Sequence, residues 1–85
     1  MRPGDVVSGT NGSVTITGMQ WRVQLRGAEG SSVVLTVLAQ RPNGRKLARD
    51  WTRASGIALP TDAQIITAMQ QVEATAEADI VSALS

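Results

Sequence analysis

A strictly alternating segment gives the clearest structural signal in the chain. From Met19 to Arg26, apolar residues occupy every second position, and Gln or Arg occupies the positions between them. A period of two residues is typical of a β-strand with one buried face and one polar face. Gly18 interrupts the parity that Val14 and Ile16 set, which predicts a bulge or a bend at Gly18.

Two further strands are expected after this one, joined by a tight turn. Residues 33–39 are apolar at every position but one, which indicates a central strand covered on both faces, or one whose second face meets a partner. Pro42-Asn43-Gly44 predicts a hairpin turn, because Pro fixes the first turn dihedral and Asn-Gly accepts positive φ. In the return strand, 45–53, Arg residues share a face with apolar ones, which suits the edge of a sheet.

The period changes from strand to helix after Pro60. Thr61 and Gln64 fit a capping box at a helix N-terminus, and apolar residues then recur at helical spacing as far as Leu84. Such a helix is about 34 Å long at 1.5 Å per residue, whereas a seven-residue strand spans about 23 Å. We therefore expect the last helical turns to overhang the sheet, where they either fray or dock on something else.

These elements predict an α+β fold for residues 1–85 as a single domain. Residues 19–53 supply three antiparallel strands, and residues 61–84 supply one long C-terminal helix that packs on the sheet. Residues 1–18 are rich in Gly, Ser and Thr, and they form either a flexible arm or a short hairpin around residues 9–12. Counting that hairpin, the small antiparallel sheet has three to five strands.

The composition excludes several kinds of chemistry. The chain has no His, Cys, Tyr or Phe, so it offers neither a disulfide nor a thiolate nucleophile, and neither a Cys-type zinc site nor an imidazole base. It also has no recognisable catalytic or phosphate-binding motif. We therefore expect a protein that is not an enzyme, with no cofactor, metal or small-molecule substrate. No apolar run is long enough to span a bilayer, and we expect a cytoplasmic protein.

The charges are strongly segregated along the chain, although their total is only +1. Residues 1–53 hold all eight basic residues and three acidic ones, a net charge of +5. Residues 54–85 hold four acidic residues and no basic one, a net charge of −4. An Arg-bearing sheet and an acidic helix can complement each other within one chain, between two copies in a homodimer, or against a foreign partner.

The pattern favours a non-enzymatic protein-protein interaction module, such as a small accessory or inhibitor protein of bacteria or phages. Its partner is another protein or a second copy of the chain. The residues expected to bind an anionic partner are the exposed cations of the predicted sheet, namely Arg22, Arg26, Arg45, Lys46 and Arg49. Those expected to dock on apolar surface are at the helix end, namely Ile80, Val81 and Leu84. Each Trp is expected in the core rather than at an interface.

The alternative is a DNA-binding protein that reads the major groove with a three-stranded sheet. The polar row on residues 20–26 alternates Gln with Arg, and these side chains recognise adenine and guanine edges. Against this interpretation stand the sequence pI of about 8.5, the acidic C-terminal third and the single Lys46. DNA-binding proteins commonly make about 6–10 phosphate contacts, so DNA binding would be expected to use more cations for phosphates.

Overall fold

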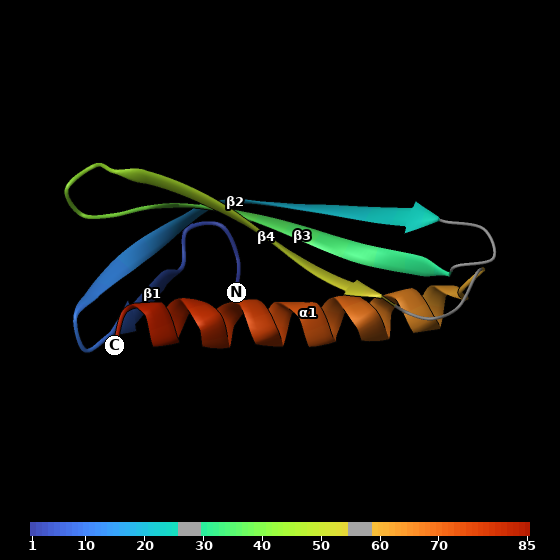
Figure 1. The fold of residues 1–85 in the computed structure, drawn as a ribbon. Coiled ribbons are helices and arrows are strands. Elements are labelled where there is room, and N and C mark those ends of the chain that lie inside the picture. The colour runs from blue at the N-terminus through green and yellow to red at the C-terminus, as the bar shows by residue number, and fades with distance from the viewer. Residues whose placement is uncertain (26–29, 55–58) are drawn as a thin grey trace.

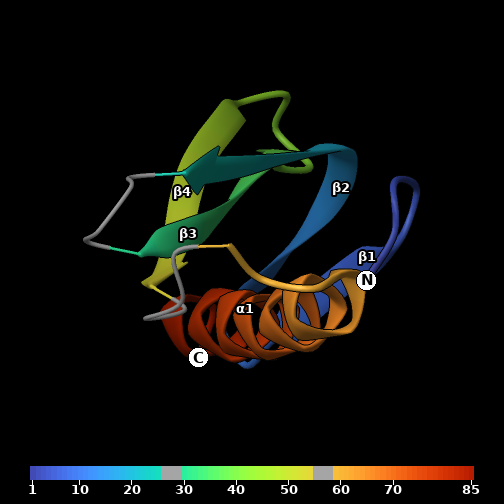
Figure 2. The same cartoon turned by 90° about the vertical axis from the view of Figure 1, so that its right-hand side faces the viewer.

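In the computed structural model, which describes residues 1–25, 30–54 and 59–85, an antiparallel sheet lies over one helix (Figure 1). The elements of these described residues are β1 (Val6–Gly9), β2 (Gly12–Leu25), β3 (Ser31–Gln40), β4 (Lys46–Ala54) and α1 (Asp62–Ala83). The strands pair in chain order, β1-β2-β3-β4. The helix covers one face of the sheet, and the opposite face is open (Figure 2). The predicted α+β fold class is confirmed.

The irregularity predicted at Gly18 is present as a bulge in β2. The β2–β3 register shifts between Ile16 and Gly18, so that Thr17 is an extra residue in the ladder. One inserted residue reverses the alternation of the side chains that follow it. For this reason Ile16, before the bulge, and Met19 and Trp21, after it, all pack on the side of the sheet that carries the hydrophobic core.

The turn between β3 and β4 has the structure that its sequence predicts. Gly44 has φ = 90°, and its N–H donates a hydrogen bond of 2.9 Å to the carbonyl of Arg41. The Arg41 N–H donates in turn to the carbonyl of Arg45 at 2.8 Å. The side-chain oxygen of Asn43 accepts from the Arg45 N–H at 3.0 Å. A three-residue loop with a glycine at positive φ is a common hairpin connection.

The hydrophobic core lies between the sheet and α1, with β3 at its centre. Leu35 and Ile16 are fully buried. On the open face, Val34 is also only 4% exposed, since side chains of the two neighbouring strands flank it. This agrees with a central strand apolar on both faces. The buried core residues are Val7, Val14, Ile16, Leu35, Val37, Ala39, Trp51, Val72, Ala76 and Leu84.

The helix begins at the predicted capping box. The Thr61 hydroxyl accepts a hydrogen bond from the Gln64 N–H at 3.3 Å, and the Gln64 side chain accepts one from the Thr61 N–H at 2.9 Å. This reciprocal pair satisfies two amide donors that a helix N-terminus otherwise leaves without partners. The helix contacts β1, β3 and β4. Among the described residues, no helix combines the length and apolar character that crossing a membrane requires.

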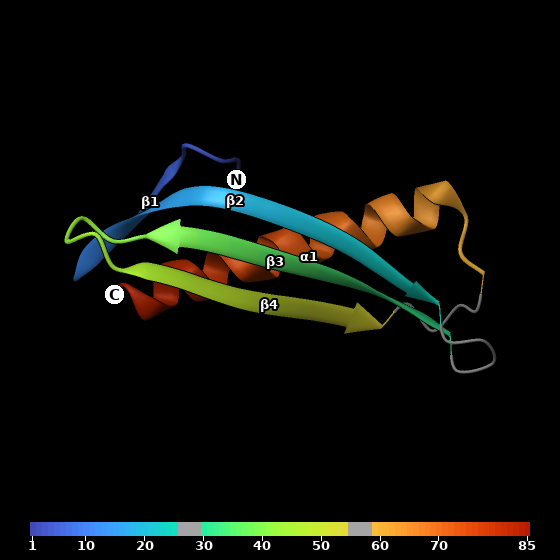
Figure 3. The same ribbon diagram turned by 90° about the horizontal axis from the view of Figure 1, so that it is seen from above.

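The expected overhang of the last helical turns is wrong. At about 3.3 Å per residue, the 14 residues of β2 exceed the length of the helix. The sheet therefore reaches the end of α1, and the β1–β2 hairpin packs there (Figure 3). The Asn11 N–H at the hairpin tip donates to the carbonyl of Leu84 at 2.6 Å. Of the two alternatives for the first eighteen residues, the structure has the hairpin.

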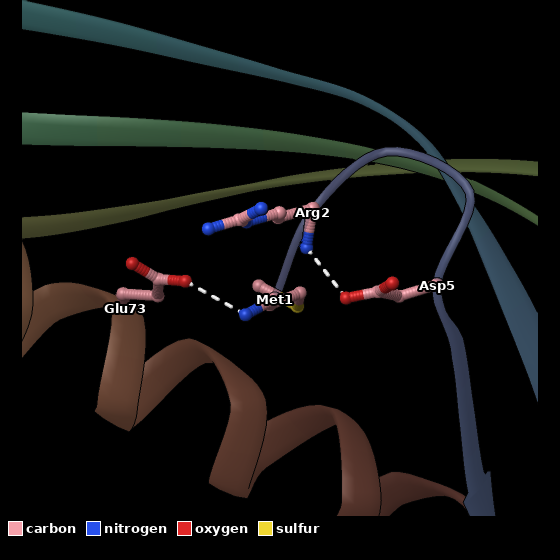
Figure 4. A network of polar contacts seen from close by, with 4 residues as sticks. All are labelled: Met1, Arg2, Asp5 and Glu73. Atoms are coloured by element: carbon pink, nitrogen blue, oxygen red, sulfur yellow. Dashed lines mark hydrogen bonds and ion pairs between the residues drawn. The ribbon is translucent and has the colours of Figure 1, made fainter.

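The chain before β1 folds back onto α1 (Figure 4). The amino group of Met1 donates a hydrogen bond of 2.9 Å to Oε1 of Glu73. The Arg2 N–H donates to Oδ2 of Asp5, also at 2.9 Å, which closes a turn before β1. The hydrogen bond from Met1 to Glu73 raises the pKa of the amino group above its ordinary value of 8.0.

The raised pKa of the Met1 amino group predicts a pH-dependent contribution to stability. Below about pH 8 the amino group is charged in both the folded and the unfolded chain, so the contact with Glu73 is fully present. As the pH rises through the folded-state pKa, this contribution is lost. The test is thermal unfolding of the 85-residue chain with a free Met1 amino group. In Glu73→Gln, the decline of stability above pH 8 should be less steep than in the wild type. An unchanged pH profile in this variant contradicts the assignment.

Candidate functional site

On the open face of the sheet, a nearby carboxylate partly offsets the charge of the predicted cationic residue Arg22. The Arg22 guanidinium lies 3.7 Å from Oδ2 of Asp50 on β4. Asp50 also accepts a hydrogen bond of 2.6 Å from the Thr36 hydroxyl. The polar row on β2 thus meets an acidic side chain at the centre of this face. Arg26, which the sequence places in the same row, lies outside the described residues.

The other predicted cations gather along one edge of the sheet. Strand β4 and the turn before it carry five basic residues against the single acid Asp50, and all five are exposed. Within the described part of the chain, none of the five forms an ion pair. They comprise the predicted residues Arg45, Lys46 and Arg49, together with Arg41 and Arg53. This edge therefore combines exposed positive charge with a strand that has a neighbour on one side only.

The predicted apolar docking residues divide into three environments, and one of the three predictions needs correction. Val81 is 38% exposed, as expected, and Ile80 is half-buried against the core. Leu84 is only 4% exposed, because the β1–β2 hairpin covers the end of α1. It is a core residue and offers no free surface for docking. Leu84 and Ile80 nevertheless meet again in the wall of a cavity.

This cavity lies on the seam between β4 and α1, and its volume is about 250 Å³. Its walls are almost wholly apolar. The sheet contributes Val37, Ala39, Leu47 and Trp51, and the helix contributes Ile80, Ala83 and Leu84. Arg41, Arg49 and Asp79 also line it and supply its polar atoms. The predicted residues Arg49, Ile80 and Leu84, far apart in the sequence, are thus brought together at one place.

Two further hollows continue the same seam toward the start of the helix. The first, of about 130 Å³, lies between Trp51 to Arg53 on β4 and Val72 and Thr75 on α1. The second, of about 330 Å³, lies between Arg53 and Ala54 and the helical residues 63–71. Trp51 lines both the cavity of about 250 Å³ and the hollow of about 130 Å³. Arg53 lines both the hollow of about 130 Å³ and the one of about 330 Å³, so the three follow one another along the seam. We call this row of three hollows the β4–α1 groove; in Figure 1, the end of β4 approaches α1 closely.

Trp51 is the fixed element of the groove. Its indole Nε1 donates a hydrogen bond of 2.9 Å to Oδ2 of Asp79 on the helix. The guanidinium of Arg49 lies 4.9 Å from the centre of its ring, within the range of a cation–π contact. Trp51 is 8% exposed, as expected for a core residue. It therefore holds β4 to α1 and lies between the cavity of about 250 Å³ and the neighbouring hollow of about 130 Å³.

The outer edge of β4 offers backbone hydrogen-bonding groups to solvent. The Arg41 N–H bonds to the carbonyl of Arg45, so these two residues form a hydrogen-bonded pair of the antiparallel ladder. Because such pairs alternate along the ladder, the β4 residues at odd positions, 47–53, bond to β3. The even positions, 46–54, direct their N–H and C=O groups away from the sheet. An exposed edge of this kind is a template for a further strand.

Among the described residues, no group of three or more acidic side chains gathers to hold a metal ion. Leu47, Arg53 and Ala83 line the groove but are not among the site residues predicted from the sequence. The signal was present, since Leu47 and Trp51 share one strand face with Arg49 and Arg53. The chain matches no protein-family model, no curated protein and no solved structure.

Proposed function

We propose that this protein is a non-enzymatic interaction module that binds another protein along the β4–α1 groove. The observation that carries the proposal is the coincidence of three features at β4: a strand edge without a neighbour, an apolar cavity beside it, and exposed cations on its rim. Each feature alone is common on small domains. Together they supply the backbone, apolar and electrostatic parts of a protein-recognition site.

The residues of the groove have distinct proposed roles. Arg45, Lys46 and Arg49 lie on the rim, where exposed cations attract an anionic partner and fix its orientation. Leu47, Ile80 and Ala83 form part of the apolar wall against which a partner side chain packs. Arg and Trp are enriched among residues that dominate binding energy in interfaces. A module of this size acts by occupying a surface of its partner, as accessory and inhibitor proteins do.

Selection from a displayed library of random decapeptides tests the proposal. The wild-type chain should enrich peptides above background. Their affinity should fall by about tenfold, or about 1.4 kcal/mol, for the variant Ala83→Phe, whose larger side chain fills the cavity. Ala78→Phe is the matched control, because Ala78 is also an exposed alanine of α1 but does not line the groove. Affinities for both variants are measured by fluorescence anisotropy.

Two outcomes contradict the proposal. The first is no enrichment on the wild-type chain, and the second is equal loss of affinity in Ala83→Phe and Ala78→Phe. A mixed-sequence DNA duplex is tested as a third probe in the same assay. Strong binding that weakens steeply with salt, and that is lost in Arg22→Ala but retained in Ala83→Phe, favours the major-groove alternative instead.

A further inference from the structure

We propose that the occupant of the groove is an extended acidic segment of the partner, which adds to β4 as a fifth strand of the sheet. This inference rests on the proposed function and names the conformation and chemistry of the bound partner. The bound segment directs alternate side chains toward the β4–α1 groove, where its apolar side chains enter the hollows and its carboxylates meet Arg49 and Arg53, which line them. The side chains between these face the open side of the sheet.

The free backbone edge of β4 favours a strand over a helix as the occupant. Because hydrogen-bonded pairs alternate along the ladder, the N–H and C=O groups of the even positions in Lys46–Ala54 face away from β3. A helix satisfies its own backbone groups internally and leaves such an edge without partners. An added strand pairs with each of these groups, which is the mode of β-strand addition.

The charges of this edge favour an acidic segment over a second copy of the chain. Residues 41–54 carry five cations and one acid, and that acid, Asp50, is already engaged by Arg22 and Thr36. Pairing of β4 with β4 of another copy sets two such cationic strands side by side, which is destabilising. The acidic residues of α1 are held in a helix and do not supply a strand.

The hollows favour apolar side chains among those that the bound segment directs toward α1. The cavity of about 250 Å³ lies between Leu47 and Trp51, four residues apart on β4. Along an extended chain, side chains on one face repeat about every 6.6–6.8 Å. A segment that runs beside β4 therefore directs alternate side chains toward Ile80 and Ala83, and then toward the two other hollows. Arg49 and Arg53 line the hollows on this same face, so carboxylates between the apolar side chains of this row lie next to them.

The first test compares three decapeptides labelled with fluorescein, measured by anisotropy. One carries Val and Glu in turn at its odd positions with Ser between them, one has Lys in place of Glu, and one has the acidic composition rearranged into a helix-forming order. The acidic alternating peptide should bind at least about tenfold more tightly than the other two. Arg53→Glu should weaken its binding by about fivefold or more, whereas Arg2→Glu, the same charge change outside the groove, should not.

The second test identifies strand addition itself. The alternating acidic peptide is N-methylated at its odd residues in one version and at its even residues in another. One version should lose about tenfold in affinity, because it cannot donate to the edge of β4, and the other should keep its affinity. N-methylation does not alter the protein, so a loss in one version only cannot come from misfolding of the chain.

Three results overturn this inference. They are equal affinity of the two methylated versions, preference for the helix-forming peptide, and preference for the basic peptide. One of these results can occur while the peptides selected from the library still lose affinity for Ala83→Phe. In that case the groove binds a partner in another conformation. The proposed function then stands without the fifth strand. A stable dimer of the unliganded chain by light scattering, abolished by Arg53→Glu, assigns the edge to a second copy instead.

Discussion

Replacing Gly9 with Ala is expected to lower the free energy of unfolding by about 2–3 kcal/mol, as overpacking at a buried contact does. A Cβ at this position lies 2.5 Å from the carbonyl oxygen and 2.7 Å from the Cβ of Leu84. The obstacle is the backbone at the end of α1, which no side-chain rotation relieves. The helix end must move away, and the hydrogen bond from the Asn11 N–H to Leu84 is strained or lost.

Urea denaturation of Gly9→Ala and of the control Ser8→Ala measures this effect. Ser8 is the exposed neighbour of Gly9 on β1, so its substitution should change stability by less than about 0.5 kcal/mol. If α1 ended free of the hairpin, Ala would be neutral or stabilising at Gly9, because it restricts the unfolded chain more than Gly does. A neutral Gly9→Ala variant therefore contradicts the docking of the helix end.

Replacing Trp51 with Ala is expected to cost about 3–5 kcal/mol of stability. The substitution removes the largest core side chain of β4, enlarges the adjoining cavity, and deprives Asp79 of the indole N–H. Trp51→Phe retains most of the apolar bulk and loses mainly the hydrogen bond to Asp79, so it should cost about 1–2 kcal/mol. Thermal and urea unfolding of the two variants give the difference directly.

A small effect of Trp51→Ala, below about 1 kcal/mol, shows that the indole does not hold β4 to α1. Such a result would mean that Trp51 is not the core residue that its 8% exposure indicates. The expected large effect also explains why Ala83→Phe is the better probe of the groove. Ala83 is exposed on the helix, and a larger side chain there fills the cavity without removing a core contact.

Local signals in the sequence account for most of the secondary structure. The alternation from Met19 onward, the parity change at Gly18, the turn at residues 42–44 and the capping box at Thr61 each reflect interactions between residues close in the chain. All four appear in the structure. The mixed character of residues 45–53 likewise indicated an edge strand, and β4 is one.

The errors and omissions concern contacts between distant segments. The predicted overhang of the helix end assumes a sheet only as long as a seven-residue strand. In the structure the bulge at Gly18 allows β2 to continue over 14 residues with Val14, Ile16, Met19 and Trp21 all on the core side. The hairpin at residues 6–15 can then reach Leu84, and a residue expected at an interface becomes part of the core.

The sequence by itself determined the kinds of element, their order and the segregation of charge, because periodicity, turn chemistry and capping act over a few residues. Only the tertiary structure decided which cations share a surface. Arg22 faces Asp50 on the open face, whereas Arg49 joins Trp51 and Ile80 around one cavity. The twist of the sheet and the docking of its hairpin on α1 set these distances, and both depend on contacts between residues more than seventy positions apart, such as Asn11 and Leu84.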